Sequence, residues 1–176
     1  MTGRTLLLLR HAKSSWGDPS LADFDRPLAK RGREAAPLVG REMARRGWAP
    51  GMAIVSPALR TTQSWELVAG ELPAAPDLLF EPSIYEAEPE ALLSAIRRLP
   101  DRIATAVLVG HNPGMEQLAA MLCGQAGDEA AMARMRAKFP TAAMACLELS
   151  TGWEGLGQKS AALTAFVTPR DLAGRS

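Results

Sequence analysis

The stretch Thr5-Leu6-Leu7-Leu8-Leu9 leads directly into Arg10-His11, and this stretch decides the fold. An apolar run without polar alternation is typical of a strand buried on both faces of a sheet. A second run, Thr105 to Val109, leads into Gly110-His111. The chain has two histidines, and each one follows the end of an expected strand. Because open α/β sheets bind ligands at the carboxyl ends of their strands, we expect both imidazoles in one shared site.

Apolar runs and amphipathic helical patterns alternate along the rest of the chain, as in α/β folds. We expect strands at 5–9, 52–55, 78–80, 105–109, 144–149 and 162–167. Helices are expected at 29–46, 57–72, 89–99, after 113, and at 129–138. This order predicts a three-layer α/β/α sandwich with a mainly parallel sheet. No repeat, low-complexity tract or linker interrupts it, so we expect one domain over residues 1–176.

The composition is that of a globular protein, with 47% hydrophobic and 22% charged residues among 176. A net charge of +1 gives no electrostatic reason to expect nucleic acid or an acidic membrane as a partner. No apolar run approaches the ~18 residues of a membrane span. Cys123 and Cys146 lie in apolar surroundings without metal-type spacing, which favours buried free thiols in a reducing compartment. We therefore expect a cytoplasmic protein.

Two arginines are placed to reach the same edge of the sheet. Arg10 directly precedes His11. Ser56-Pro57 is typical of a helix start, with serine as N-cap and proline at the first helical position, which puts Arg60 in the first turn. Asn112-Pro113 repeats this pattern after His111. Two imidazoles, two guanidinium groups and two helix N-termini are thus expected around one crevice.

Such a crevice suits a phosphoryl dianion. Guanidinium groups grip two oxygens in fork geometry, and helix N-termini supply N–H groups and positive potential. A neutral imidazole, with a reference pKa near ~6.5, has a lone pair that can attack phosphorus. The residues alone therefore point to phosphoryl chemistry.

The chain resembles the histidine phosphatase superfamily, which has the phosphoglycerate mutase-like fold. The resemblance is carried by Leu9-Arg10-His11-Ala12-Lys13-Ser14, Asp25-Arg26-Pro27-Leu28 with Gly32, Ser56-Pro57-Ala58-Leu59-Arg60-Thr61-Thr62-Gln63, and Val109-Gly110-His111-Asn112-Pro113. The short chain, Lys13 and the Gly-His-Asn-Pro segment make it most similar to the SixA-type phosphohistidine phosphatase branch.

The resemblance implies a role for each matching position. His11 would be the nucleophile, and Arg10, Arg60 and His111 would hold the phosphoryl oxygens. Glu86 would protonate the leaving group and later activate water. Ser14 and Lys13 would be further substrate contacts.

Two positions depart from the pattern of the superfamily. Ala12 replaces the usual glycine after the histidine. Gly17 stands where mutase-like relatives tend to have a phosphate-binding asparagine, which argues against a mutase.

These observations predict a metal-independent phosphatase without a cofactor, working through a covalent phosphohistidine on His11. Its partner would be a protein carrying phosphohistidine or a small phosphorylated metabolite. A broad phosphomonoesterase, a mutase and a non-catalytic phosphate-binding module are the alternatives. A metal site is disfavoured, because no HxH or HExxH spacing exists and the arginines would repel a cation.

Each of these residues also has a purely structural interpretation. His111 could cap the helix after Pro113, and Arg60 could be a solvated helix residue. Glu86 and Glu88 could be solvated acids before a helix N-terminus. Lys13, Arg31 and Arg33 are expected on a solvated rim, from which they could guide an anionic partner toward the crevice.

Overall fold

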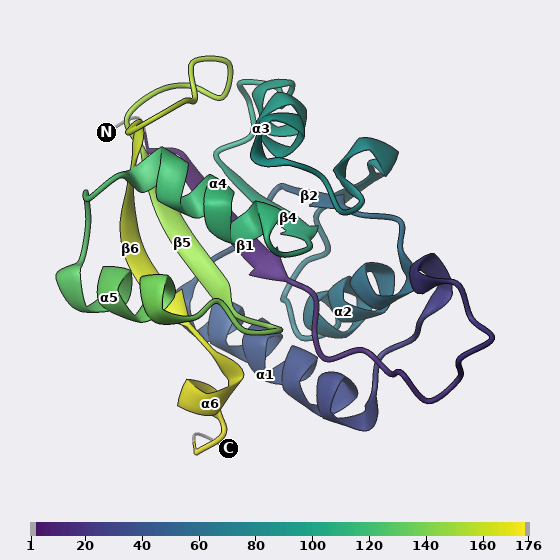
Figure 1. Cartoon of the computed structure of the whole chain (residues 1–176). Coiled ribbons are helices and arrows are strands. Elements are labelled where there is room, and N and C mark those ends of the chain that lie inside the picture. The colour runs from purple at the N-terminus through teal and green to yellow at the C-terminus, as the bar shows by residue number, and fades with distance from the viewer. Residues whose placement is uncertain (1–2, 175–176) are drawn as a thin grey trace.

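The first strand, β1 (Thr5–Arg10), lies inside a six-stranded sheet, with β4 (Thr105–Gly110) on one side and β5 (Met144–Leu149) on the other. The computed structural model describes residues 3–174 (Figure 1). Leu6 and Leu8 pack into one apolar cluster and Leu7 and Leu9 into a second, on the opposite face. All four are almost completely buried, and each buried leucine contributes roughly 1.5–3 kcal/mol. The strand is therefore buried on both faces, as expected.

The strand order is β3-β2-β4-β1-β5-β6, where β2 is Met52–Val55, β3 is Asp77–Phe80 and β6 is Ala161–Val167. The pairs β3–β2, β2–β4 and β4–β1 are parallel, whereas β5 runs antiparallel to both β1 and β6. The sheet is thus mainly parallel, which confirms the prediction. At its edge, β3 leaves Leu78, Leu79 and Phe80 about half exposed.

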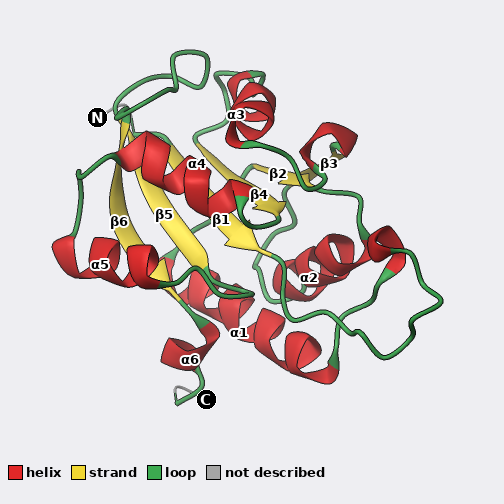
Figure 2. Cartoon of the chain, viewed as in Figure 1, coloured by secondary structure: helices red, strands yellow, loops and turns green. Residues whose placement is uncertain are grey.

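Helices cover both faces of the sheet, as Figure 2 shows. One face carries α1 (Lys30–Arg46), α2 (Leu59–Ala69) and the short α6 (Pro169–Leu172), whose apolar residues join the cluster around Leu7 and Leu9. The other face carries α3 (Pro89–Arg97), α4 (Gly114–Cys123) and α5 (Glu129–Ala137). The three-layer α/β/α sandwich predicted from the sequence is therefore correct.

Most predicted boundaries lie close to the observed ones, and α1 ends at Gly47 in the left-handed conformation (φ 71°) that favours glycine. Pro37 lies inside α1. The helix predicted at 57–72 was too long, because Ala58 still has an extended backbone (ψ 146°). Helix α6 and two 3-10 turns, Asp23–Asp25 and Pro82–Ile84, were not predicted. Residues 3–174 include no helix with the length and apolar character needed to cross a membrane.

The loop after β1 is fastened to the start of α1 by backbone contacts. The Lys13 carbonyl accepts a hydrogen bond from the Ala29 N–H (2.9 Å), and the Ser15 N–H donates to the Pro27 carbonyl (2.8 Å). Gly32 permits this approach, because a Cβ atom there would lie 2.2 Å from the Lys13 carbonyl oxygen. The segment that follows His11 is thereby held against α1.

This contact predicts that Gly32→Ala destabilises the protein, although alanine is ordinarily the better helix residue. The expected loss of unfolding free energy is about 1–3 kcal/mol, since the overlap is with backbone and must displace the loop. Urea denaturation would measure it. Gly51→Ala is the matched control, because the nearest atom to a Cβ there is 3.5 Å away, an ordinary contact. Equal stability of the two variants would contradict the prediction.

Candidate active site

The two histidines meet because β1 and β4 pair in parallel with Arg10 opposite Gly110. The His11 N–H donates to the Gly110 carbonyl (3.1 Å), which extends the ladder one residue beyond the strand. The imidazole centroids are 5.4 Å apart, and both side chains are buried. The sequence expectation that these rings share one site is therefore correct.

Arg60 extends from the first turn of α2 into the same place, as predicted. Its side chain is 2% exposed, and Nη2 lies 3.2 Å from Nδ1 of His111. The same nitrogen contacts the carboxylates of Asp23 (3.0 Å) and Glu86 (3.1 Å). One guanidinium group thus connects four segments of the chain, and it is not a solvated helix residue.

His11 is held in a single tautomer. Its Nδ1 lies 2.8 Å from the Ala12 carbonyl oxygen, which can only accept, so Nδ1 carries the proton and the lone pair is on Nε2. Burial lowers the pKa of His11 to about 4. The positive charges of Arg60 and Arg10 also lower this pKa, whereas the hydrogen bond to Ala12 raises it. At neutral pH the ring is uncharged and nucleophilic at Nε2.

His111 is also neutral. Its pKa is lowered to about 3, mainly by burial and to a smaller extent by the neighbouring His11 and Arg60. Because Arg60 donates to Nδ1, the proton of His111 lies on Nε2 and is donated to Ser56 Oγ (2.7 Å). Tyr85 stacks on this ring with a centroid distance of 5.4 Å.

The interpretation of Ser56 and Pro57 as the cap and first residue of a helix is wrong. Helix α2 begins at Leu59, with Ala58 at the N-cap and no side-chain cap. The hydroxyl of Ser56 instead orients His111. Asn112 does accept from the Glu116 N–H (3.2 Å), so it contributes to the start of α4, although Pro113 occupies the N-cap position.

The side chain of Arg10 is held by the segment between α5 and β5. Its Nη1 donates to the Phe139 carbonyl (2.9 Å). Burial lowers the pKa of Arg10, whose normal value lies far above neutrality. Within residues 3–174, the buried Nε atoms of Arg10 and Arg60 have no hydrogen-bond partner. Unsatisfied buried donors are costly, and here they belong to two guanidinium groups whose charges act on both histidines.

Glu86 lies at the mouth of the site on the loop after β3. Its side chain is 56% exposed and its backbone has φ 46°, an unusual conformation for a residue other than glycine. It pairs with Arg60, so the structure brings its carboxylate to the site although the side chain stays more than half exposed.

Sequence reasoning missed Asp23 and Tyr85. The Asp23 carboxylate accepts from Arg60 and from the Tyr85 hydroxyl (2.5 Å). Burial alone would raise the pKa of Asp23, but the hydrogen bond from Tyr85 and the charge of Arg60 hold it well below its usual range. Both residues lie in irregular segments, where the sequence offers no periodic signal that would have identified them.

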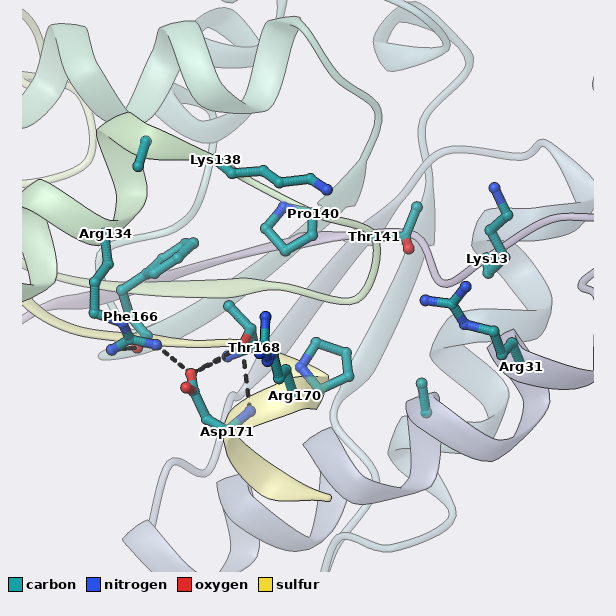
Figure 3. Close-up of a pocket in the computed structure, with 13 residues that line it drawn as sticks. Lys13, Arg31, Arg134, Lys138, Pro140, Thr141, Phe166, Thr168, Arg170 and Asp171 are labelled. Carbon is teal, nitrogen blue, oxygen red and sulfur yellow. Dashed lines mark hydrogen bonds and ion pairs between the residues drawn. The ribbon is translucent and has the colours of Figure 1, made fainter. Parts of the chain in front are cut away.

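The side chains of Ser14 and Lys13, which follow His11 closely in the chain, lie in different surroundings: Ser14 is buried and Lys13 is exposed. The Oγ of Ser14 accepts from Nη1 of Arg26 (2.8 Å), whose guanidinium carbon lies 3.5 Å from the centre of the Trp16 ring. Arg26 lies in the Asp25-Arg26-Pro27-Leu28 segment that carries the family resemblance, but the sequence predicts no particular role for it. Lys13 is exposed, and its side chain lines a neighbouring groove (Figure 3).

The described part of the chain holds no cluster of three or more histidine, cysteine, aspartate or glutamate side chains arranged to bind a metal ion. Cys123 and Cys146 are buried free thiols, and burial raises the pKa of Cys123 to about 12. The groups gathered at the strand ends are therefore imidazoles, guanidiniums and two carboxylates. This set can bind a tetrahedral oxyanion and present it to a neutral imidazole.

Comparison with known proteins identifies the class. Residues 6–88 match the model of the histidine phosphatase superfamily, branch 1. An uncharacterised protein of Mycobacterium tuberculosis is 35% identical over 163 residues, covering 92% of this chain and all of that protein. An uncharacterised chloroplastic protein of Arabidopsis thaliana is 37% identical over 131 residues, 69% of this chain and 60% of that one.

Solved structures point to the same superfamily. One described as a phosphohistidine phosphatase SixA from Agrobacterium tumefaciens superposes with a TM-score of 0.80 at 28% identity, covering 94% of this chain and 98% of that one. A protein histidine phosphatase SixA complexed with tungstate has the same fold, with a TM-score of 0.77 at 20% identity and 96% and 99% coverage. The chain belongs to the histidine phosphatase superfamily, with its phosphoglycerate mutase-like fold, and is an enzyme of the phosphatase class. Within the superfamily it falls in the SixA-type branch.

The low pKa values of the two histidines predict a pH-dependent stability. Each ring is neutral when folded and titrates near ~6.5 when unfolded, so unfolding takes up protons from about pH 6.5 down to the folded pKa values of about 4 for His11 and about 3 for His111. The unfolding free energy should therefore fall as the pH drops through this window. Urea denaturation of the wild type and of the His11→Gln/His111→Asn double variant would measure the slope. A slope unchanged in the double variant would contradict the assignment.

Proposed function

We propose that this protein removes phosphoryl groups from phosphohistidine in a protein partner, without a metal ion, through a covalent intermediate on its own His11. The observation that carries the proposal is the state of His11. A neutral ring with Nδ1–H held by the Ala12 carbonyl keeps the Nε2 lone pair available beside Arg60 and His111. A site that only binds phosphate has no need for an unprotonated nucleophile.

In the first step Nε2 of His11 attacks phosphorus, and the bond between phosphorus and the substrate nitrogen breaks. When the other nitrogen of the substrate ring carries a proton, imidazole leaves as a neutral molecule and requires no acid. In the second step water attacks the phosphoryl group on His11. Inorganic phosphate departs, the water proton passes to solvent or to a nearby carboxylate, and His11 leaves neutral with its proton still on Nδ1.

The guanidinium groups would stabilise the charge on the phosphoryl oxygens. Arg60 is held by Asp23 and Glu86 in the structure, and Glu86 is the more exposed of the two. An incoming phosphoryl group would displace Glu86 from Arg60, while Asp23 and Tyr85 keep the guanidinium in place. Tungstate, bound in the related SixA structure, is a tetrahedral oxyanion like phosphate, which supports a pocket of this kind. We assign Ser14 an indirect role, as the acceptor that orients Arg26.

One observation favours a second candidate function. Glu86 lies at the pocket mouth, 3.1 Å from Arg60, where a displaced carboxyl group could protonate an alkoxide. An alkyl phosphate expels a strongly basic alkoxide and needs such an acid, whereas imidazole does not. A phosphomonoesterase acting on small metabolites is therefore the alternative.

Replacement of the nucleophile tests the proposed mechanism. We expect His11→Ala to lower phosphate release by at least about a thousandfold, because the covalent route is lost. Wild-type enzyme incubated with labelled substrate and quenched in alkali should retain an acid-labile phosphoryl group on His11. His11→Ala protein that folds normally and releases phosphate at the wild-type rate would reject the mechanism.

Replacement of Glu86 distinguishes the two substrates. For Glu86→Gln we expect little change with a phosphohistidine protein, but a loss of roughly 10²-fold in kcat with an alkyl phosphate, since general acids typically supply at least this much. Glu88→Gln is the matched control, because Glu88 is exposed on the same loop and is not part of the Arg60 ion pairs. A large loss with both substrates would contradict the view that imidazole leaves without an acid.

A further inference from the structure

A groove of about 510 Å³ lies between α1, α5 and α6, and its lining does not include His11, His111 or Arg60. Figure 3 shows Lys13 and Arg31 on one side of it, Arg134 and Arg170 on the other, and Lys138 at a third position on the rim. Five cationic side chains from four separate segments thus surround one depression. All five are exposed.

The positive charge of the groove is largely uncompensated. Asp171 is the single carboxylate in its lining, and this residue is already paired with Arg134 while its oxygen caps the start of α6. Across residues 3–174, Lys13, Arg31, Lys138 and Arg170 form no ion pair. The groove therefore carries a local excess of positive charge in a chain whose net charge is only +1.

The groove also adjoins the nucleophile through the backbone. Lys13 is two residues after His11. On the opposite wall, Thr141 directly precedes Ala142, whose N–H donates to the carbonyls of Arg10 and His11 (3.1 and 3.0 Å). A chain segment lying in the groove would consequently pass close to the backbone that carries His11.

The shape and lining favour a polypeptide. Between the cations lie Pro140, Pro169 and Ala35, with Phe166 buried beneath them, which gives an apolar floor below a basic rim. Single-stranded nucleic acid is bound through exposed aromatic rings, and the one aromatic residue here is only 4% exposed. A lipid surface is flat or convex toward the protein, whereas this site is concave.

We propose that the groove binds an acidic segment of the phosphorylated protein substrate, next to the phosphohistidine that enters the His11 pocket. This inference rests on the proposed function and adds the surface that recognises the substrate. The basic rim steers and holds the acidic segment, and the apolar floor contacts its side chains.

Binding is tested without catalysis, using a fluorescein-labelled oligoglutamate peptide and fluorescence anisotropy. The test variant is Lys138→Glu/Arg170→Glu, two exposed rim residues outside the phosphoryl pocket. The matched control is Arg102→Glu/Lys159→Glu, two exposed cations near the opposite end of the sheet, beside the starts of β4 and β6. We expect the wild type and the control to bind equally, the test variant at least about tenfold more weakly, and salt to weaken binding.

Turnover then separates docking from chemistry. With a protein phosphorylated on histidine by phosphoramidate, the test variant should show a KM raised by about tenfold and an unchanged kcat. With a small aryl phosphate, the wild type and both double variants should be equal. If no protein phosphohistidine is hydrolysed but the peptide still binds at the groove, the proposed function fails and the groove remains a site for acidic chains.

Three results would overturn the inference. The first is that the wild type does not bind oligoglutamate. The second is that the test variant binds as tightly as the wild type. The third is that the groove mutations abolish binding of a single-stranded oligonucleotide or of phosphatidylserine vesicles while peptide binding is unaffected, which would assign the groove to that ligand.

Discussion

The parallel register between β1 and β4 is the constraint on which the site depends. Pairing of Arg10 with Gly110 fixes both strand ends at one level, so His11 and His111 leave the sheet side by side. A shift of one residue would bring Thr5 or Arg10 to a position that a buried leucine now occupies, so a polar or charged group would enter an apolar cluster. The energy that holds the core in register therefore also holds the imidazoles together.

The loops that follow the strands supply the groups that hold Arg60 in the site. Arg60 alone would be an expensive buried charge, and the carboxylates of Asp23 and Glu86 compensate it. The two carboxylates differ in exposure, and Asp23 is also held by Tyr85 and Arg26. Asp23 is thus the more firmly held partner of the guanidinium, and Glu86 is the more exposed one.

The sequence was informative where side chains follow regular elements. The buried strands placed His11 and His111 correctly, because position along a strand determines where a side chain points. Arg60 lies in the first turn of α2 as predicted, although the helix begins at Leu59 and not at Pro57. Ser56 was misassigned, since a serine before a proline has the same local pattern whether its hydroxyl caps a helix or orients a histidine. Lys13 and Arg31 are exposed, as expected from the sequence, and they line the basic groove. Asp23, Tyr85 and the cations of the opposite wall depend on how distant segments fold back, and no local pattern specifies that path.

The hydrogen bond between His11 and the Ala12 carbonyl has a further consequence for the chemistry of the ring. It commits the pros nitrogen to the backbone and leaves the tele nitrogen as the single position at which a phosphoryl group can be carried. The regiochemistry of any phosphoenzyme formed here is consequently set by the main chain. Substitution of neighbouring side chains would alter rates without changing the isomer produced.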